Sequence, residues 1–182
     1  AGNIFALFKK YQDTLDNGQK AIFGIGYAQF ARLDNKLIVS KPLRKEKSLN
    51  FKVDIGAGLP YGNTATSMPY DYSFFGGGAN DIRGWRARAL GPGSYKYYLD
   101  LTRTATQIGD LGISASAEFR FPISSLIKSA IFVDAGNIWT IFDDVNRPGG
   151  QISGNWYKEI AISAGLGLRL DLDFFIVRVD LG

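Results

Sequence analysis

The chain has 182 residues, of which 46% are hydrophobic and 14% aromatic, so it is too apolar to be a disordered tail. Its net charge of +4 is modest, and it contains neither histidine nor cysteine. The missing residue types exclude His-based catalytic triads, thiol nucleophiles and nearly all zinc sites. We therefore expect no enzyme, no metal centre, no cofactor and no nucleic-acid partner.

Alternation of apolar and polar residues predicts β-strands and no helix. Residues 113–121 are the clearest case, because the odd positions are apolar and the even ones are Ser114, Ser116, Glu118 and Arg120. In chain order the pattern predicts eight strands, at about 2–11, 19–32, 35–43, 48–59, 107–121, 127–139, 157–170 and 173–182. The predicted fold class is all-β, with antiparallel pairing.

The lengths of the strands and of their connections indicate a transmembrane β-barrel. Strands of about ten residues match the roughly 9–11 residues that a tilted strand needs to cross a bilayer. Short turns at 12–18, 44–47, 122–126 and 171–172 alternate with long connections at 60–106 and 140–156. The exception is the connection at 33–34, which is a tight turn where a long connection would be expected. Aromatic residues flank the second long connection, as in an interfacial girdle: Trp139, Phe142, Trp156 and Tyr157. A soluble barrel with its polar face outside is the alternative.

The connection 60–106 contains a glycine-rich stretch that carries one central arginine. The stretch includes Gly76, Gly77, Gly78, Ile82, Arg83, Gly84 and Trp85. Glycine accepts positive φ and allows close backbone approach, while a buried guanidinium requires carboxylate partners. Glu118 and Asp134 lie on consecutive predicted strands joined by a short turn, so both can face the interior next to this connection.

Two catalytic interpretations of these residues find little support. A carboxylate pair can perform acid–base chemistry, but nothing indicates a substrate pocket, and Arg83 would neutralise both acids. The glycine run could form an oxyanion or phosphate loop, yet no Gly-x-Ser-x-Gly elbow or Walker lysine accompanies it. We therefore expect Arg83, Glu118 and Asp134 to form a structural lock.

Three ordered motifs make the chain similar to the BamA/TamA outer-membrane assembly superfamily, the bacterial surface antigen barrel domains. They are Ile-Arg-Gly-Trp at 82–85, Glu-Phe-Arg-Phe-Pro at 118–122 and Phe-Val-Asp-Ala-Gly at 132–136. Two further stretches, 88–95 and 165–169, most resemble the TamA-like lipoprotein branch of Bacteroidetes. The resemblance covers residues 48–182 well and the first strands only by pattern.

The resemblance implies that the connection 60–106 is an extracellular loop folded into the lumen, where Arg83 reaches Glu118 and Asp134. It also implies a sixteen-stranded barrel in which residues 1–182 supply the eighth to the fifteenth strands. We therefore expect a C-terminal barrel fragment without its final strand.

The function that the resemblance implies is assembly and insertion of outer-membrane proteins, or translocation of surface proteins, at the bacterial outer membrane. The implied partners are outer-membrane lipids, unfolded outer-membrane client proteins, and periplasmic or surface accessory subunits. A two-partner-secretion export pore of the same fold is one alternative. A soluble β-barrel that binds a small ligand is the other.

Overall fold

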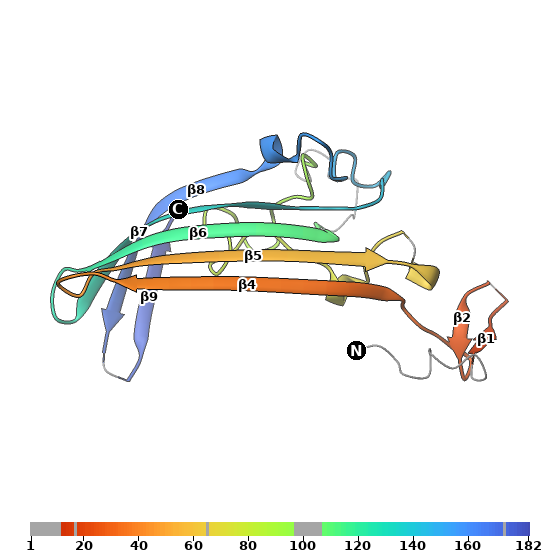
Figure 1. The fold of residues 1–182 in the computed structure, drawn as a ribbon, viewed down its shortest axis with the longest axis horizontal. Coiled ribbons are helices and arrows are strands. Elements are labelled where there is room, and N and C mark those ends of the chain that lie inside the picture. The colour runs from red at the N-terminus through yellow and green to blue at the C-terminus, as the bar shows by residue number, and fades with distance from the viewer. Residues whose placement is uncertain (1–11, 17, 65, 97–106, 173) are drawn as a thin grey trace.

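The computed structural model describes residues 12–16, 18–64, 66–96, 107–172 and 174–182. Six antiparallel strands form one sheet in the order β4-β5-β6-β7-β8-β9. Their bounds are Phe30–Pro42 (β4), Ser48–Pro60 (β5), Leu111–Pro122 (β6), Ile127–Trp139 (β7), Ala161–Asp171 (β8) and Ile176–Leu181 (β9). Consecutive strands are neighbours throughout, and β4, β5 and β6 run side by side along the long axis of Figure 1. The sheet is open, since β4 and β9 do not pair with each other among the described residues. The structure is therefore all-β and corresponds to part of a barrel wall.

The first part of the chain differs from the sequence prediction. A small separate sheet holds three short strands, Gln12–Thr14 (β1), Lys20–Ile22 (β2) and Ile25–Gly26 (β3). A two-residue turn separates β2 from β3, and both turn residues have positive φ, 53° at Phe23 and 75° at Gly24. This geometry is typical of a type I′ turn, and it interrupts the strand predicted at 19–32.

The tight turn predicted at 33–34 is wrong. β4 runs without a break through Leu33 and Asp34, which pair with Ala57 and Gly56 of β5. Asp34 and the asparagine after it are turn formers, but turn chemistry is a local signal. The thirteen-residue β5 pairs with β4 along its whole length and satisfies the backbone groups that a turn would expose.

The other predicted strands are found with shifted ends. The strand at 127–139 matches β7, and 48–59 matches β5 to within one residue. β6 and β8 each begin four residues later than predicted, because residues 107–110 are irregular and a 3-10 turn, η6 (Trp156–Glu159), precedes β8. The strand predicted at 2–11 lies outside the described residues. No helix in the described part of the chain is long and apolar enough to cross a membrane.

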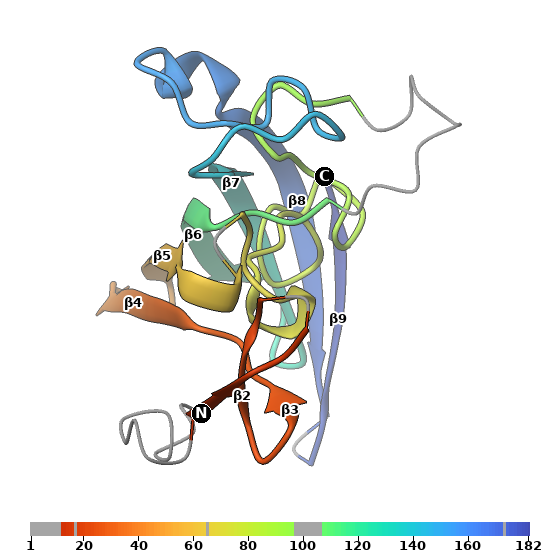
Figure 2. The ribbon, with the colours of Figure 1, turned by 90° about the vertical axis from the view of Figure 1, so that its right-hand side faces the viewer.

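The two faces of the sheet differ in chemistry. Figure 2 shows a curved sheet with residues 66–96 on its concave side. Large apolar side chains alternate along the strands on the opposite, convex side and are exposed there: Phe51, Ile55, Leu59, Ile131, Val133, Ile162, Leu166, Leu168, Val177, Val179 and Leu181. A continuous exposed apolar surface of this kind marks contact with a membrane or a partner.

Small residues on the concave face let the long connection approach the sheet. A Cβ at Gly56 would lie 2.1 Å from a ring carbon of Phe74, and one at Gly58 would lie 2.9 Å from Met68 Cε. A side chain at position 56 would therefore displace the Phe74 ring, whereas one at position 58 would require only the flexible end of Met68 to shift. The buried apolar core lies between the sheet and the connection and includes Met68, Ile82, Leu90, Ile108, Phe132 and Ile138.

One residue of the proposed aromatic girdle is not at a surface. Trp139 is fully buried, because η6 packs over it and its indole N–H donates a hydrogen bond of 2.6 Å to Glu159 Oε2. Phe142, Trp156 and Tyr157 are exposed. Three of the four aromatic residues are thus exposed, and their place in an interfacial girdle stays a prediction.

Candidate functional site

The glycine-rich stretch folds back on itself into a tight turn. Gly77 and Gly78 have φ of 92° and 111°, a region that residues with a side chain rarely adopt. The Gly78 N–H donates to the Trp85 carbonyl at 3.0 Å, and the Gly77 N–H donates to Asp81 Oδ2 at 2.8 Å. Gly76 pairs with Leu90 in an isolated β-bridge that closes the turn. The turn presents Arg83 to the sheet.

Arg83 makes its strongest contacts with Asp134 of β7. Its Nε donates to Oδ2 and its Nη2 donates to Oδ1, both at 2.7 Å, and its backbone N–H donates to Oδ2 at 3.1 Å. The Arg83 side chain is 6% exposed and that of Asp134 is fully buried. A bidentate guanidinium–carboxylate pair of this kind is strong and directional.

Glu118 of β6 is the second carboxylate partner. Its Oε2 accepts a 2.7 Å hydrogen bond from Arg83 Nη1. Its other oxygen accepts from Arg169 Nη2 at 2.8 Å and from Arg120 Nε. The structure thus brings Arg83, Glu118 and Asp134 into direct contact, and it adds two arginines that compensate the second carboxylate.

Four residues of this group were not predicted as partners of Arg83. Ser116 Oγ accepts from Arg83 Nη2 at 3.1 Å and donates to Asp134 at 2.7 Å. The guanidinium lies 3.4 Å from the centre of the Phe132 ring, and Asp180 Oδ2 of β9 lies 3.7 Å from Nη1. Arg169 joins through Glu118. Alternation could have found Ser116 and Arg169, since both lie on the polar faces of their strands. We call Arg83 and these contacts the Arg83 cluster: Ser116, Glu118, Phe132, Asp134, Arg169 and Asp180.

The residues on either side of Arg83 fix its position. Ile82 is buried, and a Cβ at the Gly136 position of β7 would lie 2.9 Å from its Cδ1. The Gly84 N–H donates to Ser163 Oγ of β8 at 3.2 Å, and a Cβ on Gly84 would lie 2.5 Å from Ser163 Cβ. Trp85 is half-buried. Arg83 therefore enters the cluster from a backbone that is seated on two strands.

This arrangement is poorly suited to catalysis. Both carboxylates are bound by guanidinium groups, so neither is free to abstract a proton. The N–H groups of Gly77 and Gly78 already donate within the turn, so they cannot bind an oxyanion or a phosphate. In the described ranges no group of three or more acidic, His or Cys residues is placed to hold a metal ion.

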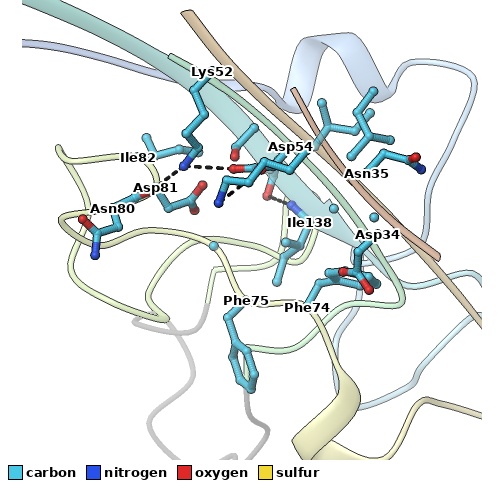
Figure 3. Close-up of a pocket in the computed structure, with 18 residues that line it drawn as sticks. Asp34, Asn35, Lys52, Asp54, Phe74, Phe75, Asn80, Asp81, Ile82 and Ile138 are labelled. Carbon is cyan, nitrogen blue, oxygen red and sulfur yellow. Dashed lines mark hydrogen bonds and ion pairs between the residues drawn. The ribbon is translucent and has the colours of Figure 1, made fainter. Parts of the chain in front are cut away.

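A cavity of about 350 Å³ lies beside the cluster, between β4, β5 and the glycine-rich turn. Figure 3 shows Lys52 reaching across it, with its Nζ 2.9 Å from Asp54 Oδ2 and 2.6 Å from the Asn80 carbonyl. Asp34 and Asp81 also line it. The cavity is thus lined by both charged and apolar side chains, and one of its lysines fastens the turn to β5.

A separate ion pair orders the connection between β7 and β8. Asp144 accepts from Arg147 Nε at 2.7 Å and from the Asn146 backbone N–H at 2.8 Å. Partial burial acts to raise the pKa of Asp144, but these donors stabilise the carboxylate and the net effect is a pKa below its usual value. Arg147 also donates to the Ile108 carbonyl at 3.0 Å.

The sequence match to known families agrees with this geometry. Residues 14–182 match the model of the Omp85 superfamily domain. The chain belongs to the Omp85 superfamily. Members of this family are β-barrel proteins of the bacterial outer membrane that act in assembly or transport.

Two relatives extend the comparison. The Omp85 chain is 29% identical over 143 residues to the outer membrane protein assembly factor BamA of Neisseria meningitidis serogroup B (strain ATCC BAA-335 / MC58). The aligned region covers 68% of the chain and 17% of the relative. It also resembles the crystal structure of BamA from Haemophilus ducreyi lacking POTRA domains 1-3, with a TM-score of 0.67, 20% identity, and coverage of 88% of the chain and 32% of that structure. The chain thus spans less than a third of either relative. Its affiliation with the TamA-like lipoprotein branch stays a prediction.

Proposed function

We propose that this chain forms part of an Omp85 barrel that assembles and inserts outer-membrane proteins, and that the Arg83 cluster is a structural lock within it. The proposal is supported by one observation above all. The glycine-rich turn is fastened on the concave face by a buried ion-pair group that draws on four strands, β6 to β9. We expect such a group to stabilise the curvature of the wall.

The proposed mechanism is addition of a client strand at a strand edge of the barrel, since an exposed strand edge is a template for an incoming strand. The Arg83 cluster includes Asp180 of β9, so the same group that holds the turn also contacts this strand. The proposed partners are unfolded client proteins, outer-membrane lipids on the convex face, and accessory subunits.

The alternatives account for less of the structure. An export pore of the same fold would require residues 66–96, which occupy the concave face in Figure 2, to leave that face during export. A soluble ligand-binding barrel gains no support from a sheet whose outer face is apolar and exposed. Translocation of surface proteins, as in TamA-like members, uses the same proposed edge and differs in its client.

The test is assembly of a client by the full-length protein. The protein is reconstituted in phosphatidylcholine vesicles, a urea-denatured client barrel is added, and the folded fraction is measured by its band shift on unheated gels. Arg83→Glu places a third carboxylate against two buried ones, so we expect it to lose most of the assembly activity. Arg86→Glu is the matched control, because Arg86 is exposed in the same turn. Assembly at the wild-type rate by Arg83→Glu would contradict the proposal.

A further inference from the structure

The turn between β4 and β5 is strongly basic. Residues 41–47, which we call the basic turn, carry four bases and one acid, and all seven residues are exposed. The charged residues are Lys41, Arg44, Lys45, Glu46 and Lys47. Among the described residues none of these five takes part in an ion pair. The basic turn is therefore a positive surface without a counter-charge from the described chain.

The backbone of the basic turn is strained at two of its charged residues. Lys45 and Glu46 have φ of 60° and 55°, in the left-handed region that favours glycine or asparagine. The Leu43 N–H donates to the Lys47 carbonyl at 2.7 Å and closes the turn. Residues held in such a conformation are found most often at functional positions. The strain is thus a reason to look for a ligand of these charges.

The basic turn borders the exposed apolar surface of the sheet. Val39 of β4 pairs with Phe51 of β5 and faces the convex side with it, and Lys41, two residues further along β4, faces the same way. Figure 1 shows the β4–β5, β6–β7 and β8–β9 turns together at the left-hand end of the sheet. Large apolar side chains are exposed in all three turns: Leu43, Ile123, Leu126, Phe174 and Phe175. Lysine and arginine next to apolar side chains suit the interface of a membrane, where the stem is apolar and the charge meets headgroups.

The three turns at this end differ in charge. Residues 123–126 of the β6–β7 turn include no charged residue, and residues 171–175 around the β8–β9 turn include two aspartates and no base. An acidic protein surface would also complement the basic turn. The apolar neighbours and the direction of Lys41 favour lipid instead, because phosphate groups lie directly outside the hydrocarbon region in which the strands end.

We propose that the basic turn binds the headgroup of a phospholipid with a net negative charge. Short turns of outer-membrane barrels lie on the periplasmic side, so the lipid belongs to the periplasmic leaflet. Lys41 meets the headgroup from the end of the strand, and Arg44, Lys45 and Lys47 lie beyond it at the depth of the phosphates. The inference rests on the proposed contact of the convex face with lipid, but it does not depend on the assembly activity.

Nitroxide-labelled lipids can test the proposal, because their quenching of a fluorophore reports which lipid lies beside a chosen residue. The chain has no cysteine of its own, so a fluorophore can be attached at Leu43→Cys in the basic turn, with any cysteine elsewhere replaced. The full-length protein is reconstituted in phosphatidylcholine vesicles. These contain a small fraction of phosphatidylglycerol or phosphatidylcholine with the nitroxide at the same acyl position, and quenching gives the relative binding constant of the two lipids.

Phe174→Cys is the matched control reporter. Leu43 and Phe174 are both apolar and exposed, at 41% and 85%, and both lie in turns at the same end of the sheet. Four strand spacings separate the two turns, a distance of about 19 Å along the sheet. This is more than the Debye length of about 10 Å at 0.1 M salt, so the bases of one turn are screened from the other.

We expect phosphatidylglycerol to be favoured at Leu43→Cys and neither lipid to be favoured at Phe174→Cys. One base near a membrane attracts anionic lipid by a free energy equivalent to about a fivefold change in a binding constant. The preference at Leu43→Cys should therefore be about fivefold or more. Changing all four bases of the basic turn to glutamine should abolish this preference, and 0.5 M NaCl should weaken it.

Three results would overturn the proposal. The first is equal quenching by the two lipids at Leu43→Cys, and the second is a preference there that survives the four glutamine changes. The third is quenching by neither lipid at Leu43→Cys while both lipids quench at Phe174→Cys, which would show that protein covers the basic turn. Absence of quenching at both reporters would contradict the contact of the convex face with lipid, and the inference with it.

Discussion

Replacement of Asp134 with alanine measures how much the Arg83 cluster stabilises the protein. The change removes the acceptor of three hydrogen bonds from Arg83, at 2.7, 2.7 and 3.1 Å. Solvent does not screen the pair, because the two side chains are 6% and 0% exposed. Leaving one buried charge without its partner costs about 3–5 kcal/mol. Glu118 still holds Arg83 in this variant, so we expect the lower end of the range, a loss of about 3 kcal/mol.

The assay is urea unfolding of the full-length protein in detergent micelles, followed by loss of the folded band on unheated gels. Asp54→Ala is the matched control. Asp54 also lies on the concave face and pairs with Lys52 at 2.9 Å, but its side chain is 31% exposed. Exposed pairs contribute about 1 kcal/mol or less, so this variant should lose at most that amount. Equal losses in Asp134→Ala and Asp54→Ala would refute the reasoning, because burial would then not determine the contribution.

Three further substitutions test separate contacts. Gly56→Val places carbon atoms where the Phe74 ring lies, so we expect a loss of about 1–3 kcal/mol in the same unfolding assay, whereas Gly154→Val, at an open position, should change the stability little. Phe132→Leu removes the ring beneath the guanidinium and should lower the free energy of unfolding by about 1–2 kcal/mol; an unchanged value would show that the ring contributes only volume. The pKa of Asp144 is lower in the folded protein than in the unfolded chain, where it is about 3.9. The contribution of Asp144 to stability is therefore present above the unfolded pKa and is lost as the pH falls through the lower folded pKa. In the wild type, pepsin cleavage between residues 140 and 160 should therefore rise as the pH falls through this acidic range. Asp144→Asn should already be cleaved faster above this pH range and should show no further rise within it.

Much of the sheet could be predicted because alternation reports which face of a strand is buried. That pattern predicts β5 and β7 almost to the residue, and it places Glu118 and Asp134 on one face of the sheet. The break predicted at 33–34 failed because turn-forming residues act locally, whereas β4 is held straight by thirteen pairs with β5. Strand pairing depends on residues that are distant in sequence, and local signals do not report it.

The site was predicted in part for the same reason. Glu118 and Asp134 lie on neighbouring strands joined by a short turn, so the sequence predicts these two of the three acidic neighbours of Arg83. Asp180 lies three strands further along the chain than Glu118, so only the curvature of the sheet brings it near.

The most direct test of the central claim is the rate of client folding by Arg83→Met, by Asp134→Leu and by the variant that carries both changes, in the vesicle assay described above. The claim is that the two residues act as one unit that holds the turn in place for assembly. It predicts that each single change slows client folding strongly and that the double variant is no slower than the slower single variant, because the unit is already broken. Rate losses that multiply in the double variant, or wild-type rates in the single ones, would contradict it.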